Sequence, residues 1–153
     1  MNKWLETVKP LVYESRIKVP YTWSVGEVGS RFLIALRDHK KIYGTRCAKC
    51  DRVYLPPRKT CGNCFSTLHE WVEVGPKGTL ITYTTVHYTS SVMPMKPSFA
   101  YGIILLDKAS TGLVHLLGEV NLEEIKPEMR VEAVFKDERI GDILDIRYFK
   151  PIK

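Results

Sequence analysis

The stretch GTRCAKCDRVYLPPRKTCGNCFSTLHEW, from Gly44 to Trp71, contains all four cysteines of the chain. They follow the spacing C-x2-C-x10-C-x2-C, as Cys47, Cys50, Cys61 and Cys64. Two thiolates separated by two residues share one tight turn, and two such turns can enclose a tetrahedral ion at Zn–S distances of roughly 2.3 Å. The spacing therefore predicts a zinc ribbon with four sulfur ligands.

The residues between and after the cysteine pairs favour short hairpins around the metal. A strand-like run at 52–55 ends at Pro56 and Pro57, and a second run follows at 69–74. Gly62 and Asn63 are expected to supply the left-handed backbone that such turns need. Four sulfur ligands leave no position for a reactive water, so we expect a structural metal that orders a segment too short to form its own core.

Three other uses of four thiols stay open at this point. Iron in a rubredoxin-like site would take the same ligands. Disulfides require an oxidising compartment, with intracellular proteins of hyperthermophiles as the exception. Redox catalysis by one C-x2-C pair is disfavoured, because no thioredoxin-like βαβ pattern surrounds either pair.

The composition is that of a small globular protein. The chain has 153 residues, of which 44% are hydrophobic, and this suits one domain or two small ones. Its longest uncharged apolar runs, such as Tyr101–Leu106, are too short to cross a membrane. The N-terminal MNKWLETVKP lacks the apolar core of a signal peptide. We therefore expect a cytoplasmic protein with reduced cysteines.

The sequence divides into an N-terminal helical segment at 1–43, the ribbon at 44–71 and a strand-rich segment at 72–153. Helices are expected at about 2–8 and from a capping box formed by Ser24 and Glu27. Strands are expected at 79–88, 99–106, 113–120, 130–135 and 143–149. With a helical turn at 121–125, these five strands predict a small closed OB-fold barrel and a small α+β or all-β chain.

Charge is unevenly distributed along the chain. Residues 1–60 contain 13 Lys and Arg against 5 Asp and Glu, whereas residues 61–153 contain 10 against 12. The basic part indicates an anionic partner such as a nucleic acid, a phosphorylated cofactor or an acidic protein. The alternative is a solvated basic surface on a protein from a hot environment, because the chain has no Gln and three Asn.

The sequence contains no recognisable catalytic motif. No histidine has a metal-ligand or triad spacing with another, and G-x-S-x-G, phosphate-loop and dinucleotide patterns are missing. We expect no enzyme activity from the chain alone. His87 and His115 are the residues to test for a contribution to a composite active site.

A ribbon joined to an OB-fold points to binding. OB-folds often bind single-stranded nucleic acid through stacked aromatic residues and a basic groove. Tyr54, Trp71, Tyr83 and Tyr88 could stack on bases, or could equally be core and hairpin residues. The barrel itself is net acidic, with 9 Lys and Arg against 11 Asp and Glu over 72–150, which weighs against the nucleic-acid alternative.

The chain resembles the zinc-ribbon/OB-fold family of acyl-CoA-associated proteins, formerly a domain of unknown function, and in particular its archaeal members with N-terminal helices. The resemblance covers about residues 40–151. It rests on the segments YGTRCAKC, YLPPRKTCGNC, EWVEVGPKGTLITYTTV, FAYGIILLD, MRVEAVF and RYFKP. Asp51 and Glu128 depart from the family pattern, since many members have glycine at those positions.

This resemblance implies a non-catalytic scaffold that accompanies a thiolase-fold enzyme, such as a thiolase, a hydroxymethylglutaryl-CoA synthase or a related aldolase. It also implies that the protein holds the CoA part of a substrate, with Zn²⁺ as a structural metal. The CoA phosphates would need Arg and Lys side chains. The candidates are Arg46, Lys49, Arg52, Arg58 and Lys59. Nucleic-acid binding is the alternative function.

Overall fold

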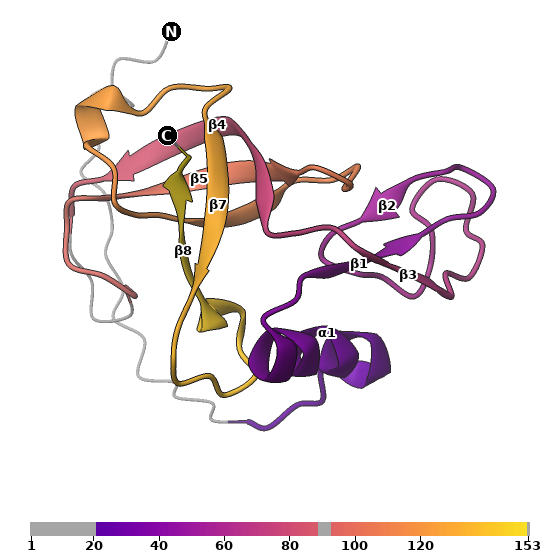
Figure 1. The fold of residues 1–153 in the computed structure, drawn as a ribbon. Coiled ribbons are helices and arrows are strands. Elements are labelled where there is room, and N and C mark those ends of the chain that lie inside the picture. Colours follow the sequence, from indigo (N-terminus) through magenta and orange to yellow (C-terminus); the bar gives the residue numbers. More distant parts are fainter. Residues whose placement is uncertain (1–20, 89–92, 153) are drawn as a thin grey trace, which may run out of the picture.

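The computed structural model describes residues 21–88 and 93–152 as an α-helix, a three-stranded sheet and a five-stranded barrel (Figure 1). The helix α1 covers Gly26–His39. The ribbon sheet has the order β2-β1-β3, with β1 at Tyr43–Arg46, β2 at Val53–Tyr54 and β3 at Glu70–Glu73. The expected helix near residues 2–8 lies outside the described residues.

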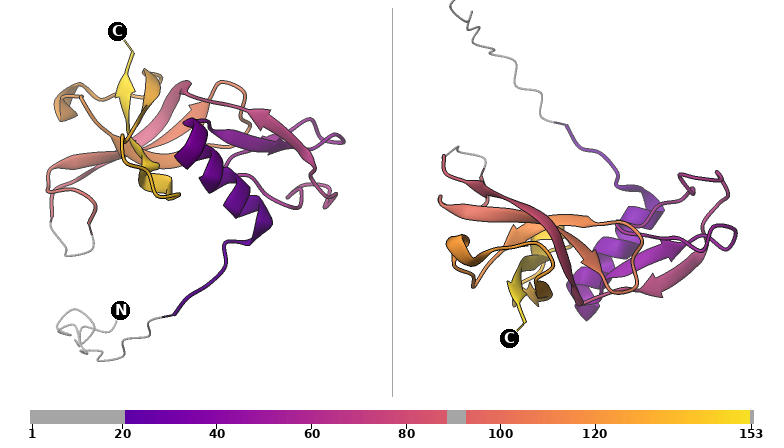
Figure 2. Two further views of the ribbon diagram at one scale, coloured as in Figure 1. Left: turned by 60° about the horizontal axis from the view of Figure 1, so that its bottom comes forward. Right: turned by 90° about the horizontal axis from the view of Figure 1, so that it is seen from above.

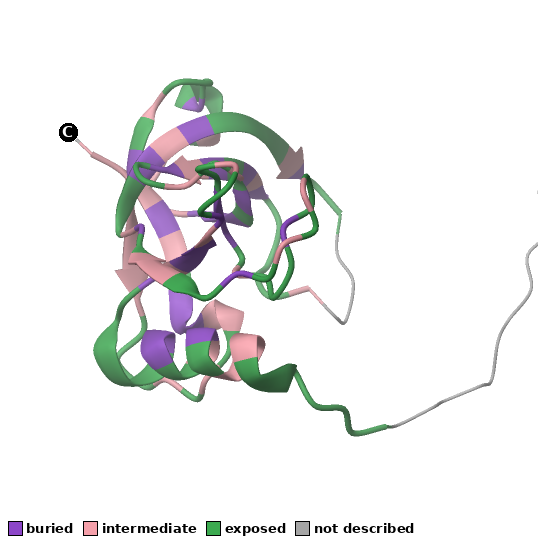
Figure 3. Ribbon diagram, turned by 90° about the vertical axis from the view of Figure 1, so that its right-hand side faces the viewer, coloured by how far each residue is buried: buried purple, intermediate pink, exposed green. Residues whose placement is uncertain are grey.

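The helix α1 packs one face against the rest of the molecule. Phe32, Ala35 and Leu36 are buried at the spacing of one helical face (Figure 3). The expected capping box is wrong, because Val25 occupies the N-cap position and makes no side-chain cap. The Ser24 hydroxyl instead accepts a hydrogen bond of 3.1 Å from the Gly26 N–H. A capping box would require the N–H of Glu27, one residue further along the chain, as the donor.

The barrel closes in the order β4-β5-β6-β8-β7 (Figure 2). Neighbouring strands are antiparallel except β6 and β8, which run parallel where Leu117 meets Phe149. A 3-10 helix at Leu122–Glu124 lies between β6 and β7, at the predicted turn. The predicted OB-fold class is thus confirmed. The strands are β4 at Lys77–Val86, β5 at Phe99–Leu106, β6 at Leu113–Leu117, β7 at Arg130–Phe135 and β8 at Ile146–Pro151.

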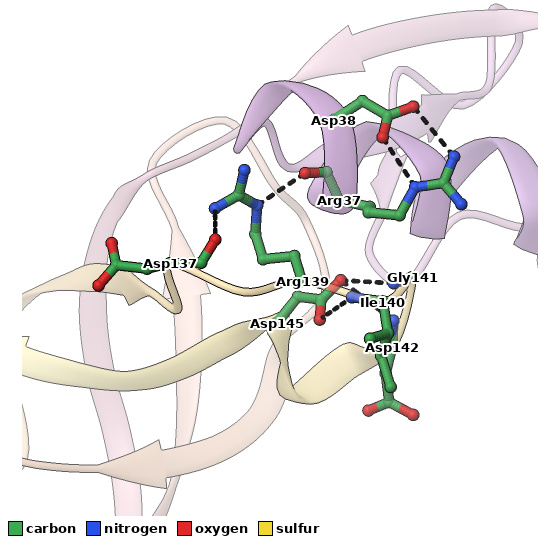
Figure 4. Close-up of polar contacts among 8 residues, drawn as sticks. All are labelled: Arg37, Asp38, Asp137, Arg139, Ile140, Gly141, Asp142 and Asp145. Atoms are coloured by element: carbon green, nitrogen blue, oxygen red, sulfur yellow. Dashed lines mark hydrogen bonds and ion pairs between the residues drawn. The ribbon is translucent and has the colours of Figure 1, made fainter.

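The last strand starts later than predicted. Residues Ile143–Asp145 form a 3-10 helix, because two aspartates offer the backbone local partners that compete with a strand ladder. The buried Asp145 carboxylate accepts hydrogen bonds of 2.8–3.2 Å from three successive backbone N–H groups (Figure 4). These donors belong to Ile140, Gly141 and Asp142.

One hydrophobic core joins the helix, the ribbon and the barrel. Its buried residues include Leu36 of α1, Val53 of β2 and Phe149 of β8. The Arg139 guanidinium also donates a hydrogen bond of 2.7 Å to the Arg37 carbonyl near the end of α1 (Figure 4). The positive charge of Arg139 also interacts favourably with the negative end of the helix dipole. The hydrogen bond and this charge interaction both help to hold α1 against the barrel.

The turn between β5 and β6 holds the strand β2 by side-chain and backbone hydrogen bonds. The Val53 N–H donates to the Ser110 hydroxyl at 3.0 Å, and the Ser110 N–H donates back to the Val53 carbonyl at 2.8 Å. The Thr111 hydroxyl accepts from the Leu55 N–H at 2.7 Å and donates to the Leu55 carbonyl at 2.9 Å. We call these four bonds the ribbon clasp.

No α-helix in the described ranges is long and apolar enough to span a membrane.

Candidate metal centre

The four cysteine sulfurs lie together at one end of the ribbon. All lie within 4.8 Å of one another, with 3.5 Å between Cys47 and Cys64 and 4.0 Å between Cys61 and Cys50. A tetrahedral ion at Zn–S distances of roughly 2.3 Å requires sulfur–sulfur separations of about 3.8 Å. A disulfide requires about 2.05 Å, and all four cysteines are free. The arrangement therefore fits one metal ion with four sulfur ligands.

Each cysteine pair is held by the same two backbone hydrogen bonds. The Cys47 N–H donates to the Arg52 carbonyl, and the Cys61 N–H donates to the Ser66 carbonyl, at 2.8 and 2.9 Å. In each turn the residue after the second cysteine donates back to the carbonyl of the first cysteine. The metal site is therefore built from two equivalent turns.

The left-handed residues of these turns differ from those expected. Gly62 and Asn63 do not have positive φ angles, whereas Asp51 and Phe65 do, at 54° and 57°. The left-handed position is thus the one directly after the second cysteine of each pair. Position 51, where the sequence analysis noted a departure from the family pattern, is thus a left-handed position, and Asp51 is of a residue type that tolerates this backbone.

Hydrogen bonds to sulfur favour the thiolate form in the second cysteine pair. The Tyr54 hydroxyl donates to the Cys61 sulfur at 3.2 Å and, with backbone N–H groups, lowers the pKa of Cys61 to about 5. The Ser66 hydroxyl lies 3.0 Å from the Cys64 sulfur and lowers the pKa of Cys64. Tyr54 is buried beside the sulfurs, so it belongs to the ribbon core and cannot stack on a base.

The surroundings of Cys50 favour its neutral thiol, through hydrogen bonds with the neighbouring cysteines and through burial. The Asn63 amide donates to its sulfur at 3.3 Å and acts to lower its pKa, but the neighbouring cysteines, Cys64 foremost, raise the pKa to about 11. Four thiolates at this separation repel one another strongly. A divalent cation at their centre would favour the thiolate form of all four, and this is the chemistry that the donor set offers.

The five basic candidates for phosphate contacts are placed differently. Arg46 forms ion pairs with Asp51 and Glu70, so its charge is largely neutralised. The Arg58 guanidinium lies over the Tyr54 ring, 5.4 Å from its centroid. Lys49, Arg52 and Lys59 are exposed and form no ion pair within the described part of the chain.

Lys59 lies beside a groove between α1 and β3. The Arg31 guanidinium lies 4.5 Å from the Trp71 ring centroid, and both residues line two adjoining cavities of about 350 and 370 Å³. His69 and Lys59 line the first cavity, and His39 lines the second. The sequence analysis named Trp71 but missed Arg31, because only the packing of α1 brings the two together.

The two histidines that were candidates for catalysis have different surroundings. His87 is exposed, and its Nδ1 atom lies 3.2 Å from the Ser98 hydroxyl. His115 is buried against Phe149, with both ring nitrogens engaged by backbone groups. Its Nε2–H donates to the Ile143 carbonyl at 3.2 Å, and its Nδ1 accepts from the Leu116 N–H at 2.9 Å. A neutral His115 is thus fully hydrogen-bonded and serves the barrel core.

His115 should make stability depend on pH. Burial lowers the pKa of His115 below its usual 6.5, so the unfolded chain binds this proton more tightly. The free energy of unfolding should therefore fall as pH drops below about 6.5, by at most about 1.4 kcal/mol per pH unit. Denaturant titrations of the wild type and His115→Gln with excess zinc, between pH 7.5 and 5, measure this. The variant should show the shallower slope, and equal slopes would contradict the assignment.

Two family models match adjoining parts of the chain. The model described as "ChsH2, rubredoxin-like zinc ribbon domain" matches residues 35–70, and "ChsH2, C-terminal OB-fold domain" matches residues 71–136. The chain belongs to the ChsH2-type family of zinc-ribbon and OB-fold proteins. The four-cysteine cluster of this ChsH2-type protein lies within the residues that the zinc ribbon model matches, as the cysteine spacing predicted.

Similar proteins agree with this assignment. A Methanocaldococcus jannaschii protein named "DUF35 domain-containing scaffold protein" is 28% identical over 123 residues, covering 77% of this chain and 86% of the relative. A solved structure titled "Ltp2-ChsH2(DUF35) aldolase" has a TM-score of 0.64 at 19% identity, covering 85% of this chain and 98% of the other. A DUF35 protein of unknown function from Sulfolobus solfataricus has a TM-score of 0.63 at 19% identity, covering 83% and 87%. The two solved structures show that this ChsH2-type chain shares their fold.

Proposed function

We propose that this protein is a non-catalytic accessory scaffold of an enzyme that acts on acyl-CoA substrates. The observation that carries the proposal is the joined ribbon and barrel, which the chain shares with a protein named as a scaffold and with a ChsH2 protein whose structure is titled as an aldolase. The histidine buried in the barrel, His115, is fully used by backbone groups, which agrees with a structural rather than a catalytic role.

The enzyme partner is proposed to have a thiolase fold, as the family resemblance implies. The complex would work in the cytoplasm, where thiols stay reduced and available to a metal. The metal is proposed to be structural Zn²⁺, bound by Cys47, Cys50, Cys61 and Cys64. The sulfur separations fit zinc, and four sulfur ligands leave no position for a substrate.

The scaffold is also proposed to contact the CoA part of the substrate. Among the five basic candidates, Lys59 is the best placed, because it borders the groove where Arg31 lies over Trp71. An aromatic ring with cations around it offers contacts for a purine and for phosphates. Lys49, Arg52 and Arg58 remain candidates on the ribbon surface, and Arg46 is the weakest because two carboxylates already pair with it.

Capture of the enzyme from native lysate tests the proposal. The tagged, zinc-loaded protein is incubated with nuclease-treated lysate of its source organism, and retained proteins are identified by mass spectrometry. A thiolase-fold enzyme should be retained in a simple ratio to the tagged protein. An unrelated tagged protein of similar charge, carried through the same steps, is the control.

Two results would contradict the scaffold function. Retention of RNA- or DNA-processing proteins in place of an acyl-CoA enzyme would support the nucleic-acid alternative. In that case the affinity of the isolated protein for single strands should fall steeply with added salt. Retention of no protein above the control would leave the scaffold function without a partner.

A further inference from the structure

Among the strands that the structure describes, none covers the edge of one half of β4. β4 pairs with β7 only through Lys77–Thr79, whereas its pairing with β5 continues to Val86. Leu80 makes the last backbone hydrogen bonds toward the β7 side, with Glu128 and Met129. Across residues 21–88 and 93–152, no strand pairs with the other side of Ile81–Val86. Backbone N–H and C=O groups on that side are available to an added strand.

A bulge lies between this half of β4 and the half that pairs with β7. The register with β5 shifts between Leu80 and Thr82, so Ile81 is an extra residue, and such bulges bend a strand. The four successive residues Ile81–Thr84 are all exposed. Because neighbouring residues of a strand point to opposite faces, both faces of this segment meet solvent. Figure 2 shows β4 and β5 running together past the other barrel strands.

Apart from the bulge at Ile81, the uncovered edge lacks the features that normally protect a sheet edge. No charged residue occurs at 78–88 or 97–106, although 26% of the chain is charged. Exposed edges usually carry lysine, proline or inward-pointing charges that prevent pairing with other chains. Here the sequence is ITYTTV, with Ile81 and Tyr83 exposed at 47% and 37%. An uncharged segment of such high β-propensity is an aggregation hazard unless a partner covers it.

We propose that the β4 edge at Ile81–Val86 receives an extended, uncharged segment of the enzyme subunit, which adds to the barrel as a strand. This inference rests on the proposed function and names the surface through which the scaffold binds its enzyme. Main-chain hydrogen bonds would supply affinity, and the apolar side chains of Ile81 and Tyr83 would select neighbouring residues of the added strand.

A second copy of this chain fits the edge less well. Six residues at about 3.3 Å each span roughly 20 Å, and one pair of strands of that length covers far less than the roughly 800 Å² per partner of a stable interface. Each copy also carries a net charge of +6, so two copies repel each other. An enzyme subunit can contact surfaces beside the edge as well and so complete the interface.

Two lysine variants test the proposal. Thr84→Lys places a charge on the exposed edge strand, and Val114→Lys places the same charge on β6, two strands away, where Val114 is 61% exposed. Tagged wild type and variants are matched for zinc content and circular dichroism and are incubated with native lysate. Thr84→Lys should retain at least tenfold less acyl-CoA enzyme than the wild type, and Val114→Lys should retain as much as the wild type.

The outcomes separate this inference from the proposed function. Equal retention by Thr84→Lys and the wild type would overturn the docking edge and leave the scaffold function intact. A wild type that retains no acyl-CoA enzyme would overturn both. Light scattering of the isolated proteins tests the second copy: a wild-type dimer that becomes monomeric in Thr84→Lys would overturn the enzyme as occupant.

Amide hydrogen exchange provides a readout that needs no variant. When the wild-type protein binds the captured enzyme, those amides of Ile81–Val86 that face the uncovered edge should exchange at least tenfold more slowly, whereas those that face β5 already pair within the barrel. Amides of β6, at Leu113–Leu117, already pair within the barrel and should keep their exchange rates. Unchanged exchange at Ile81–Val86 in the complex would overturn the proposal.

Discussion

Cys47→Ser should lose stoichiometric zinc and unfold at a temperature about 10–20 °C lower than the wild type. Structural zinc contributes on the order of 10 kcal/mol in small zinc-binding domains, and a loss of about 5 kcal/mol or more shifts the melting of a chain of this size by such an amount. Cys47 is fully buried, and its sulfur lies 3.5 Å from that of Cys64, inside the cluster. A serine oxygen is a harder ligand than a thiolate and cannot replace it at a site with four sulfur ligands.

The loss should affect the whole chain and not the ribbon alone. Val53 and Leu55 follow the first cysteine pair and belong to the shared hydrophobic core, and the ribbon clasp ties their backbone to the barrel. Elemental analysis and calorimetry of the purified protein measure the effect. Ala48→Ser, an exposed change inside the same turn, is the control and should keep metal and melting temperature. A Cys47→Ser protein with full zinc and unchanged melting would refute the site.

Phe149→Ala should lower the free energy of unfolding by about 3–5 kcal/mol. Phe149 is fully buried in the barrel, where β8 meets β6, and its ring packs edge-on against His115 at 5.6 Å between centroids. Its removal leaves a cavity lined by side chains from several strands, which cannot all move inward together. Urea or guanidinium titration at pH 7.5 with excess zinc measures the change.

The same substitution at an exposed phenylalanine is the matched control. Phe65 is 78% exposed, so Phe65→Ala removes the same atoms with little loss of burial and should change stability by less than about 0.5 kcal/mol. If the two variants were equally stable, Phe149 would not occupy the centre of the core.

The sequence predicted the cluster of four cysteines and much of the barrel, because both depend on local patterns. The cysteine spacing predicts that the four sulfurs gather, which the structure shows, and the strands at 99–106 and 130–135 have the predicted bounds. The 3-10 helix at Ile143–Asp145 was missed, because the apolar run there reads as a strand until the Asp145 carboxylate is seen to bind three backbone N–H groups.

Charge counts along the chain could not show which basic residues are neutralised. Arg46 pairs with Asp51 in the next turn and with Glu70 on the adjacent strand β3, a contact that only the sheet creates. The two departures from the family glycines are explained in the same way by the backbone. Asp51 and Glu128 both have positive φ angles, at 54° and 69°, where glycine is the least strained residue.

The ribbon clasp holds the ribbon at one angle to the barrel. Ser110 and Thr111 hold the ribbon on one end of the barrel, while the β4 edge faces outward from another part of the same barrel. Two proteins bound at these places would keep a constant distance and orientation, since neither surface can turn without breaking the clasp. The hydroxyls of Ser110 and Thr111, which lie far from both surfaces along the chain, would then contribute to the geometry of the complex.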